Sequence, residues 1–124
     1  MNTRQQGERG ERRAEAYLTA KGMNTVVRNL RYPTGEVDLV MRDGGYTVFV
    51  EVKSREGTRF GSGREAVTLT KRRRICAVAL RYLQANALLG TPVRFDVVEI
   101  RKETVSHLPD AFPYTPPKRG KGFF

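Results

Sequence analysis

The strongest constraint on this chain is a pair of strand-like runs that flank a double-glycine turn. Polar and apolar residues alternate over 36–41 and again over 48–53, which is typical of strands with two different faces. Gly44-Gly45 between them is a strong signal for a two-residue hairpin turn. The runs are therefore predicted to pair as antiparallel strands. In the first run, alternation puts Glu36, Asp38 and Val40 on one face, and Val37, Leu39 and Met41 on the other.

The predicted hairpin places two acids opposite each other. A turn at Gly44-Gly45 pairs Asp38 with Glu51, and Glu36 with Lys53. Directly opposed side chains have Cβ atoms ~4.5–5.5 Å apart, where like charges are destabilising. A divalent cation between the two carboxylates would turn this repulsion into coordination. The alternative is a solvated hairpin face on which Glu36 and Lys53 form an ordinary ion pair.

Length and charge bound the class of protein. The 124 residues fit one domain with a modest core. Lysine and arginine number 23 against 13 acids, a net charge of +10, which points to a polyanion such as nucleic acid or an anionic membrane surface. The single cysteine, Cys76, excludes a disulfide framework. No secretory signal is evident, and the most apolar stretch, 75–89, is too short to span a bilayer. We expect a cytoplasmic protein without membrane association.

Two helices are predicted. The first begins with a capping box at Thr3 and ends near Lys21-Gly22, with a buried stripe formed by Ala14, Tyr17 and Leu18. Glu11 lies on or beside this stripe, and an acid on the core-facing edge of a helix needs a partner or a function. The second helix is predicted from an N-cap at Thr70 to about Ala87.

Two further strands are predicted, over 26–31 and 93–100. In the last one, Phe95 and Val97 face one way, while Asp96, Val98 and Ile100 face the other. We expect an α/β domain over residues 1–101 and a basic, proline-rich tail over 102–124, extended or partly disordered. The only histidine, His107, lies on this tail, so a histidine-based metal site or catalytic dyad is not expected. Four tail aromatics are candidates for docking on the domain or on a partner: Phe112, Tyr114, Phe123 and Phe124.

Basic side chains gather in a loop and at the start of the second helix. The loop over 54–63 is rich in glycine and serine, and it is either functional or a plain connector. Cations in a first helical turn oppose the helix dipole, so a cluster of them there indicates that the helix start binds an anion such as phosphate. The alternative is a solvated helix end. The candidate nucleic-acid-binding residues are Arg55, Arg59, Arg64, Lys71, Arg72, Arg73 and Arg74.

The order of elements and the acids together resemble a known superfamily. Asp38 on one central strand and Glu51-Val-Lys53 on the next, with Glu11 on the first helix, resemble the restriction-endonuclease-like nucleases. Residues 35–40, 48–53 and 94–98 look like the YraN-type family, which is similar to archaeal Holliday junction resolvases; the likeness spans residues 7–100. The superfamily's first acid often follows proline, whereas Asp38 follows Val37. The resemblance implies a restriction-endonuclease-like core, a mixed central sheet of about four strands flanked by helices in the order α-β-β-β-α-β.

The resemblance also implies roles for individual residues. Asp38 and Glu51 would bind Mg²⁺, with Mn²⁺ as an alternative, and the Val52 carbonyl would be a further ligand. Glu11 would complete the shell or orient a water, and Lys53 would lie near the attacking water or the scissile phosphate. Glu36 is either a nearby second acid or the ion-pair partner of Lys53.

Three functions are compatible with these features. The first is a magnesium-dependent hydrolase, an endonuclease that cuts DNA phosphodiester bonds in structured substrates during repair or recombination. The second is a nucleic-acid-binding module that keeps the nuclease fold without catalysis. The third is a protein-interaction subunit whose aromatic tail docks on a partner. Symmetric cutting of a four-way junction would need two active sites and therefore a homodimer.

Overall fold

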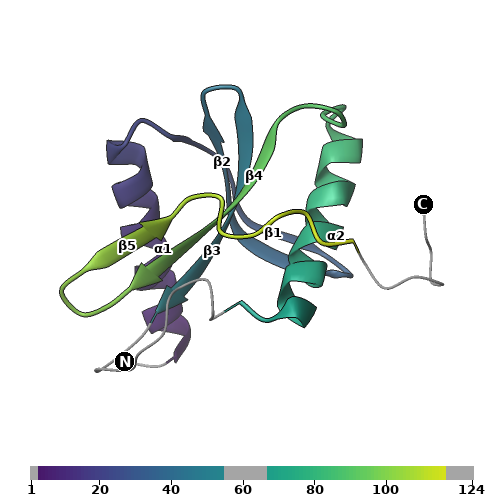
Figure 1. The fold of residues 1–124 in the computed structure, drawn as a ribbon. Coiled ribbons are helices and arrows are strands. Elements are labelled where there is room, and N and C mark those ends of the chain that lie inside the picture. Colours follow the sequence, from purple (N-terminus) through teal and green to yellow (C-terminus); the bar gives the residue numbers. More distant parts are fainter. Residues whose placement is uncertain (1–2, 55–66, 117–124) are drawn as a thin grey trace.

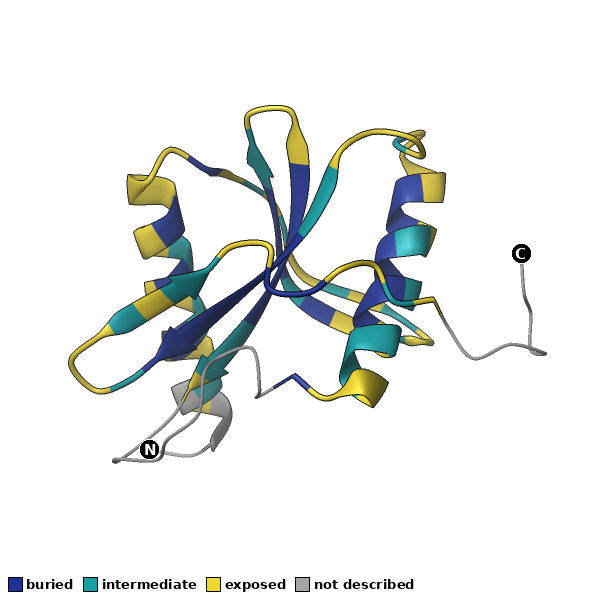
Figure 2. Ribbon diagram, in the orientation of Figure 1, coloured by how far each residue is buried: buried dark blue, intermediate teal, exposed yellow. Residues whose placement is uncertain are grey.

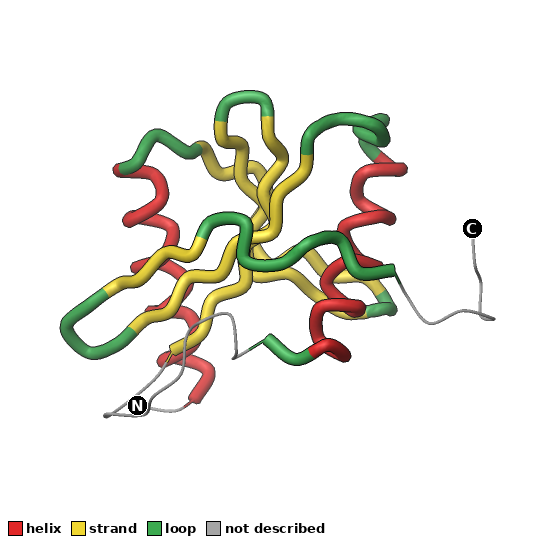
Figure 3. Tube along the Cα trace, viewed as in Figure 1, coloured by secondary structure: helices red, strands yellow, loops and turns green. Residues whose placement is uncertain are grey.

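The structure is a computed structural model that describes residues 3–54 and 67–116, without the side chains of residues 3, 4 and 6. Its elements are α1 (Thr3–Ala20), β1 (Asn24–Tyr32), β2 (Gly35–Asp43), β3 (Tyr46–Ser54), α2 (Leu69–Ala85), β4 (Val93–Ile100) and β5 (Val105–Leu108). They form one sheet in the order β1-β2-β3-β4-β5, with α1 and α2 on opposite sides (Figures 1 and 3). β3 and β4 run parallel and the other neighbours antiparallel. The predicted α/β fold with a mixed, helix-flanked sheet is confirmed, and β5 adds a strand to it.

The hairpin forms in the predicted register. β2 and β3 pair from Asp43–Tyr46 to Leu39–Val50, around a turn in which Gly44 has a φ of +59°. The ladder ends at Leu39–Val50, one position before the two acids. At the next position the Val52 N–H donates to Asp38 Oδ2 over 2.7 Å instead of to a backbone carbonyl. Asp38 and Glu51 therefore stand where the two strands stop pairing.

The predicted faces of β2 are wrong at one point. Val37 packs in the cluster under α2, whereas Leu39 packs in the cluster under α1, so the two side chains do not share a face. The neighbouring strand is irregular at the same level. Arg28 pairs with Leu39 and Leu30 pairs with Val37, while Asn29 between them has a φ of +53°. The regular alternation of the backbone is thus interrupted in both β1 and β2 beside Asp38.

The two helices differ in detail from the prediction. Gly10, Ala14 and Leu18 form the buried stripe of α1, but Tyr17 is 38% exposed. α2 is capped by Thr68 rather than Thr70: the Thr68 hydroxyl accepts the Lys71 N–H at 3.2 Å. The buried faces of both helices turn toward the sheet (Figure 2). Within the described ranges, no helix is long and apolar enough to cross a membrane.

The core includes β4 and also the segment that leads on to Phe112. β4 has the predicted bounds and faces, with Phe95 toward α2 and Val98 toward α1. Part of the segment from residue 102, which was predicted to be extended or partly disordered, forms β5 and pairs antiparallel with β4. Phe112 is buried and stacks on Phe95 with ring centroids 5.3 Å apart. It docks on the domain, whereas Tyr114 is exposed and residues 123 and 124 lie outside the described part. The core therefore continues past residue 101.

Candidate active site

Three acids from three elements meet at the point where β2 and β3 stop pairing. Asp38 on β2 interacts with Glu51 on β3 and with Glu11 on α1. Glu51 is 5% exposed, and the other two are half-buried. The structure thus places these three predicted site residues next to one another. Hairpin register brings Asp38 and Glu51 together, and the packing of α1 on the sheet brings Glu11.

Burial and mutual repulsion perturb these carboxyl groups. Burial and the Glu51 charge raise the pKa of Asp38 to about 8, against the opposing effect of the Val52 N–H. Burial and the charge of Glu36 raise the pKa of Glu11. The raised pKa of Asp38 means that the surroundings do not stabilise the full negative charge that these acids would carry if all were ionised. Such a group is suited to receive a cation.

Two lysines surround Glu51. Lys71 Nζ on α2 lies 2.6 Å from Glu51 Oε2, and Lys53 Nζ lies 3.5 Å from the same oxygen. Burial and the adjacent Lys71 lower the pKa of Lys53. Burial opposes the charge of Lys71, but hydrogen bonds to Glu51 and Lys53 outweigh it and raise the pKa of Lys71. Lys53 lies at the site as predicted, whereas the role of Lys71 there was not foreseen.

Of the two alternatives for Glu36, the ion pair with Lys53 does not form. Glu36 Oε2 instead accepts from Arg31 on β1, with distances of 3.1 Å to Nε and 2.9 Å to Nη2. Arg31 and Glu36 are direct neighbours in the β1–β2 ladder. The β2–β3 ladder has already ended at this level, so the neighbouring strand supplies the partner.

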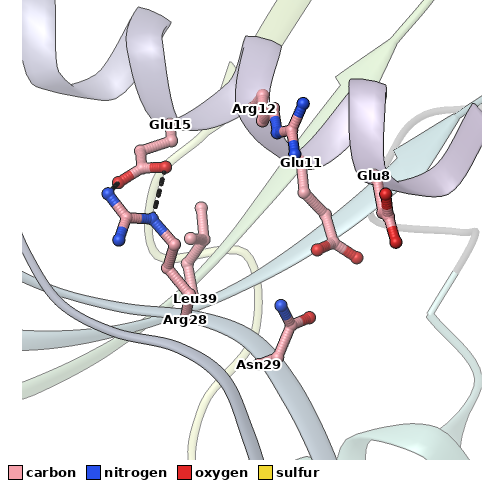
Figure 4. Close-up of a pocket in the computed structure, with 7 residues that line it drawn as sticks. All are labelled: Glu8, Glu11, Arg12, Glu15, Arg28, Asn29 and Leu39. Atoms are coloured by element: carbon pink, nitrogen blue, oxygen red, sulfur yellow. Dashed lines mark hydrogen bonds and ion pairs between the residues drawn. The ribbon is translucent and has the colours of Figure 1, made fainter. Parts of the chain in front are cut away.

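Two clefts reach the acids from opposite sides of the sheet. On the α2 side, a cleft of about 240 Å³ is lined by Gly35, Glu36, Asp38, Glu51, Lys71, Arg74 and Ile75. On the α1 side, a cleft of about 250 Å³ is lined by Glu8, Glu11, Arg12, Glu15, Arg28, Asn29 and Leu39. Figure 4 shows the Glu8 and Glu11 carboxylates on the same side of this second cleft, while Glu15 is held by Arg28. Asp38 interacts with Glu51 in the first cleft and with Glu11 in the second.

The donor set suits a hard cation. Asp38 and Glu51 supply carboxylate oxygens and Val52 a carbonyl, the ligand types that Mg²⁺ and Mn²⁺ prefer. Among the residues the structure describes, no three carboxylate, imidazole or thiol side chains already form a metal-binding group. Asp38, Glu51 and Val52 would therefore hold a metal together with water or substrate oxygens.

Sequence comparison places the chain in a family. Residues 10–100 match the family described as "Uncharacterised protein family UPF0102". The chain belongs to the UPF0102 family. A UPF0102 protein of Symbiobacterium thermophilum is 48% identical over 98 residues, which cover 79% of this chain and 83% of the relative. One from Clostridioides difficile is 39% identical over 114 residues, covering 90% and 100%, and one from Rhodococcus jostii is 45% identical over 111 residues, covering 86% and 94%. The resemblance to the YraN-type family is thereby confirmed.

The basic block of this UPF0102 protein is not a uniform cationic surface. Lys71 is engaged with Glu51, and Arg72 donates from Nε to the Val67 carbonyl and lies 5.4 Å from the Phe112 ring centroid. Arg73 is half-buried, whereas Arg74 is exposed and lines the cleft on the α2 side. Helical geometry explains the difference, because successive residues point in different directions around the axis. The other candidates, Arg55, Arg59 and Arg64, lie outside the described residues.

Sequence reasoning missed a buried ionic network on the α1 side of the sheet. Asp96 is fully buried and accepts from Arg94 Nε and Nη2, both at 2.9 Å. His107 Nε2 lies 2.7 Å from Asp96 Oδ2, and His107 Nδ1 lies 2.8 Å from Lys21 Nζ. The prediction concerned a catalytic dyad or metal site and did not foresee this pair; its histidine side chain is only 4% exposed, which suits a structural role. The network joins β4 to β5 and to Lys21, which directly follows α1.

Gly10 lets α1 approach β3 next to Glu11. A Cβ at Gly10 would clash with Ser54 Oγ, whereas nothing lies within 4 Å of a Cβ at Gly7. Gly7→Ala is expected to stabilise the protein by about 0.5–1 kcal/mol through helix propensity. Gly10→Ala should gain less than Gly7→Ala, because the new methyl group forces the exposed Ser54 hydroxyl into another rotamer. Urea unfolding of both variants measures the difference.

The double variant Gly10→Ala/Ser54→Ala serves as the control, because it removes the oxygen that the new methyl group meets. In the absence of the Ser54 hydroxyl, the Gly10→Ala change should give the full gain expected from helix propensity. Equal stabilisation by Gly7→Ala and Gly10→Ala would show that the helix does not approach the strand closely at this point.

Proposed function

We propose that this UPF0102 protein is a Mg²⁺-dependent nuclease that hydrolyses DNA phosphodiester bonds, selects for DNA structure, and acts in repair or recombination. The observation that carries the proposal is the meeting of Asp38, Glu51 and Glu11 beside Lys53. A crowded acid group is suited to hold the metal in metal-assisted hydrolysis of a phosphodiester, and an adjacent amine can stabilise negative charge on the phosphate. The resemblance of the same residues to restriction-endonuclease-like nucleases supports this interpretation.

Each residue has a role in this reaction. Asp38, Glu51 and the Val52 carbonyl would hold the metal. When bound, the metal lowers the pKa of a water molecule and stabilises the charge that develops on the phosphate. Glu11 accepts a hydrogen bond from the attacking water on the α1 side. Lys53 places a compact positive charge beside the scissile phosphate.

Charge supports DNA as the substrate. The net charge of +10 favours a polyanion, and Arg74 lies exposed at the rim of the cleft that contains Asp38 and Glu51. Contacts to phosphates fix the position of a protein on DNA without reading its bases. Recognition of backbone geometry therefore fits this cleft better than recognition of sequence. Symmetric cutting of a four-way junction would require two copies of the chain.

A cleavage assay on four-way junction, flap, nicked and linear DNA tests the proposal. Wild type is expected to cut at least one substrate with Mg²⁺ or Mn²⁺ and none with EDTA. Glu51→Gln should lose about 100-fold or more in rate, because the metal loses a charged ligand. The matched control is Glu103→Gln, which removes one acid from an exposed position between β4 and β5 and should cut like wild type. Failure on every substrate with both metals, or full activity of Glu51→Gln, would refute the proposal.

A second candidate is a nucleic-acid-binding module without catalysis. The neutralisation of Glu51 by two lysines favours it, because the acid has partners without any metal. This function predicts that DNA binding persists in EDTA, that Asp38→Asn binds DNA like wild type, and that no substrate is cut. Binding and cleavage measured on the same samples distinguish the two functions.

A further inference from the structure

Lys71 reaches the acids from α2, an element that carries none of the residues assigned to the metal site. Thr68 caps α2 and accepts the Lys71 N–H, which fixes the backbone of Lys71 at the start of the helix. From there the side chain extends to Glu51, where its Nζ lies 2.6 Å from Oε2. The Lys71 side chain is 41% exposed, while that of Glu51 is 6% exposed. One partner can therefore leave into the cleft, and the other cannot.

The Lys71 ammonium contacts the same Glu51 oxygen that a metal would need as a ligand. Mg²⁺ binds carboxylate oxygens at ~2.0–2.1 Å in a nearly octahedral shell. Glu51 Oε2 already has the Lys71 amine at 2.6 Å and the Lys53 amine at 3.5 Å. A divalent cation on this oxygen would stand close to both positive charges, so its binding and the Lys71–Glu51 contact oppose each other. Lys53 lies on the same strand as Glu51, whereas Lys71 reaches Glu51 from a separate element, α2, through its long and flexible side chain.

We propose that Lys71 is a built-in counter-cation, which competes with the divalent metal for Glu51 and swings away when the metal binds. The inference rests on the proposed function, because it assumes the metal site at Asp38 and Glu51. Lys71 lines the same cleft as Arg74, so the ammonium remains in this cleft after it leaves Glu51. Lys71 is thus a positioning residue that sets the metal affinity of the protein.

Calorimetric titration of the full chain with Mn²⁺, without DNA, tests the competition. Lys71→Met removes the competing charge and keeps most of the side-chain length, so the Kd for Mn²⁺ should fall about 10-fold, within the usual range of coupling between two ligands. Lys71→Arg should bind Mn²⁺ a few times more weakly than wild type, because a guanidinium can hold a carboxylate in a bidentate pair. Lys102→Met is the control: it removes one exposed positive charge between β4 and β5 and should leave the Kd unchanged.

Melting temperatures provide a second readout for the same variants. In EDTA, Lys71→Met should melt below wild type, since Glu51 loses its closest cation; saturating Mn²⁺ should raise its melting temperature more than that of wild type. If Lys71→Met is too unstable to titrate, the weaker binding expected of Lys71→Arg still decides the matter. Equal Kd values for wild type, Lys71→Met and Lys71→Arg would overturn this inference and leave the metal site intact. No Mn²⁺ binding by wild type or either Lys71 variant would overturn the metal site itself, and with it the proposed function.

Discussion

Asp38→Asn is expected to make the metal-free protein more stable at neutral pH while abolishing cleavage. In the folded protein, burial and the Glu51 charge raise the pKa of Asp38 to about 8, from an ordinary value of 3.8. Between these two values the folded state binds more protons than the unfolded state, so the free energy of unfolding falls as the pH rises. Asparagine carries no charge and keeps an oxygen that can accept the Val52 N–H. The expected gain at pH 7.5 in EDTA is on the order of 1–3 kcal/mol.

Urea unfolding at pH 4 and pH 7.5 measures this effect. The advantage of Asp38→Asn should be small at pH 4, where the carboxyl is largely protonated in the folded state, and largest at pH 7.5. Saturating Mn²⁺ should reverse the order, because it stabilises wild type and not the variant. Glu103→Gln should match wild type under all of these conditions. Equal stability of Asp38→Asn and wild type at both pH values would show that repulsion between Asp38 and Glu51 does not destabilise the folded protein.

Asp96→Ala is expected to cause the largest loss of stability, about 3–5 kcal/mol, because it removes the buried acceptor shared by Arg94, His107 and the Asp110 N–H. Asp96 is fully buried and is bound by Arg94, His107 and the Asp110 N–H. Burial raises its pKa, but the bonds from His107 and Arg94 outweigh burial and lower it below the ordinary value. Its contribution is therefore present above the unfolded pKa and is lost as the pH falls through the folded pKa.

Urea unfolding at pH 7 measures the loss, with Glu103→Ala as an exposed-acid control that should change stability by less than about 0.5 kcal/mol. Because Asp96 fastens β5 through His107, hydrogen exchange should show faster exchange of the β5 amides in Asp96→Ala than in wild type. A loss below about 1 kcal/mol would show that the network contributes little to stability.

Local chemistry made the hairpin predictable. The Gly44-Gly45 turn fixes the pairing from Asp43–Tyr46 to Leu39–Val50, and that register brings Asp38 beside Glu51. The faces of β4 also agree with a simple alternation of residues. In both cases the information lies within a few residues along the chain, where turn type and side-chain period act directly.

The features that were not predicted depend on distant residues. The break in alternation at Asp38 occurs beside Asn29 of the adjacent strand, whose positive φ no pattern in β2 could indicate. Lys71 belongs to a block of four cations, and only the packing of α2 selects it to reach Glu51. β5 is four residues long, and its stability comes from pairing with β4 and from the burial of Phe112 nearby. Such a short strand has little periodicity of its own.

The hydrogen bond from Val52 to Asp38 gives this protein an internal spectroscopic probe. At 2.7 Å it is a short contact between a backbone amide and a carboxylate, and such charge-assisted bonds respond strongly to the charge of the acceptor. The amide proton resonance of Val52 should therefore track the ionisation of Asp38 during a pH titration. A diamagnetic ion such as Mg²⁺ should move the same signal on binding. One backbone resonance can thus report the charge state of the acid pair in the native sequence.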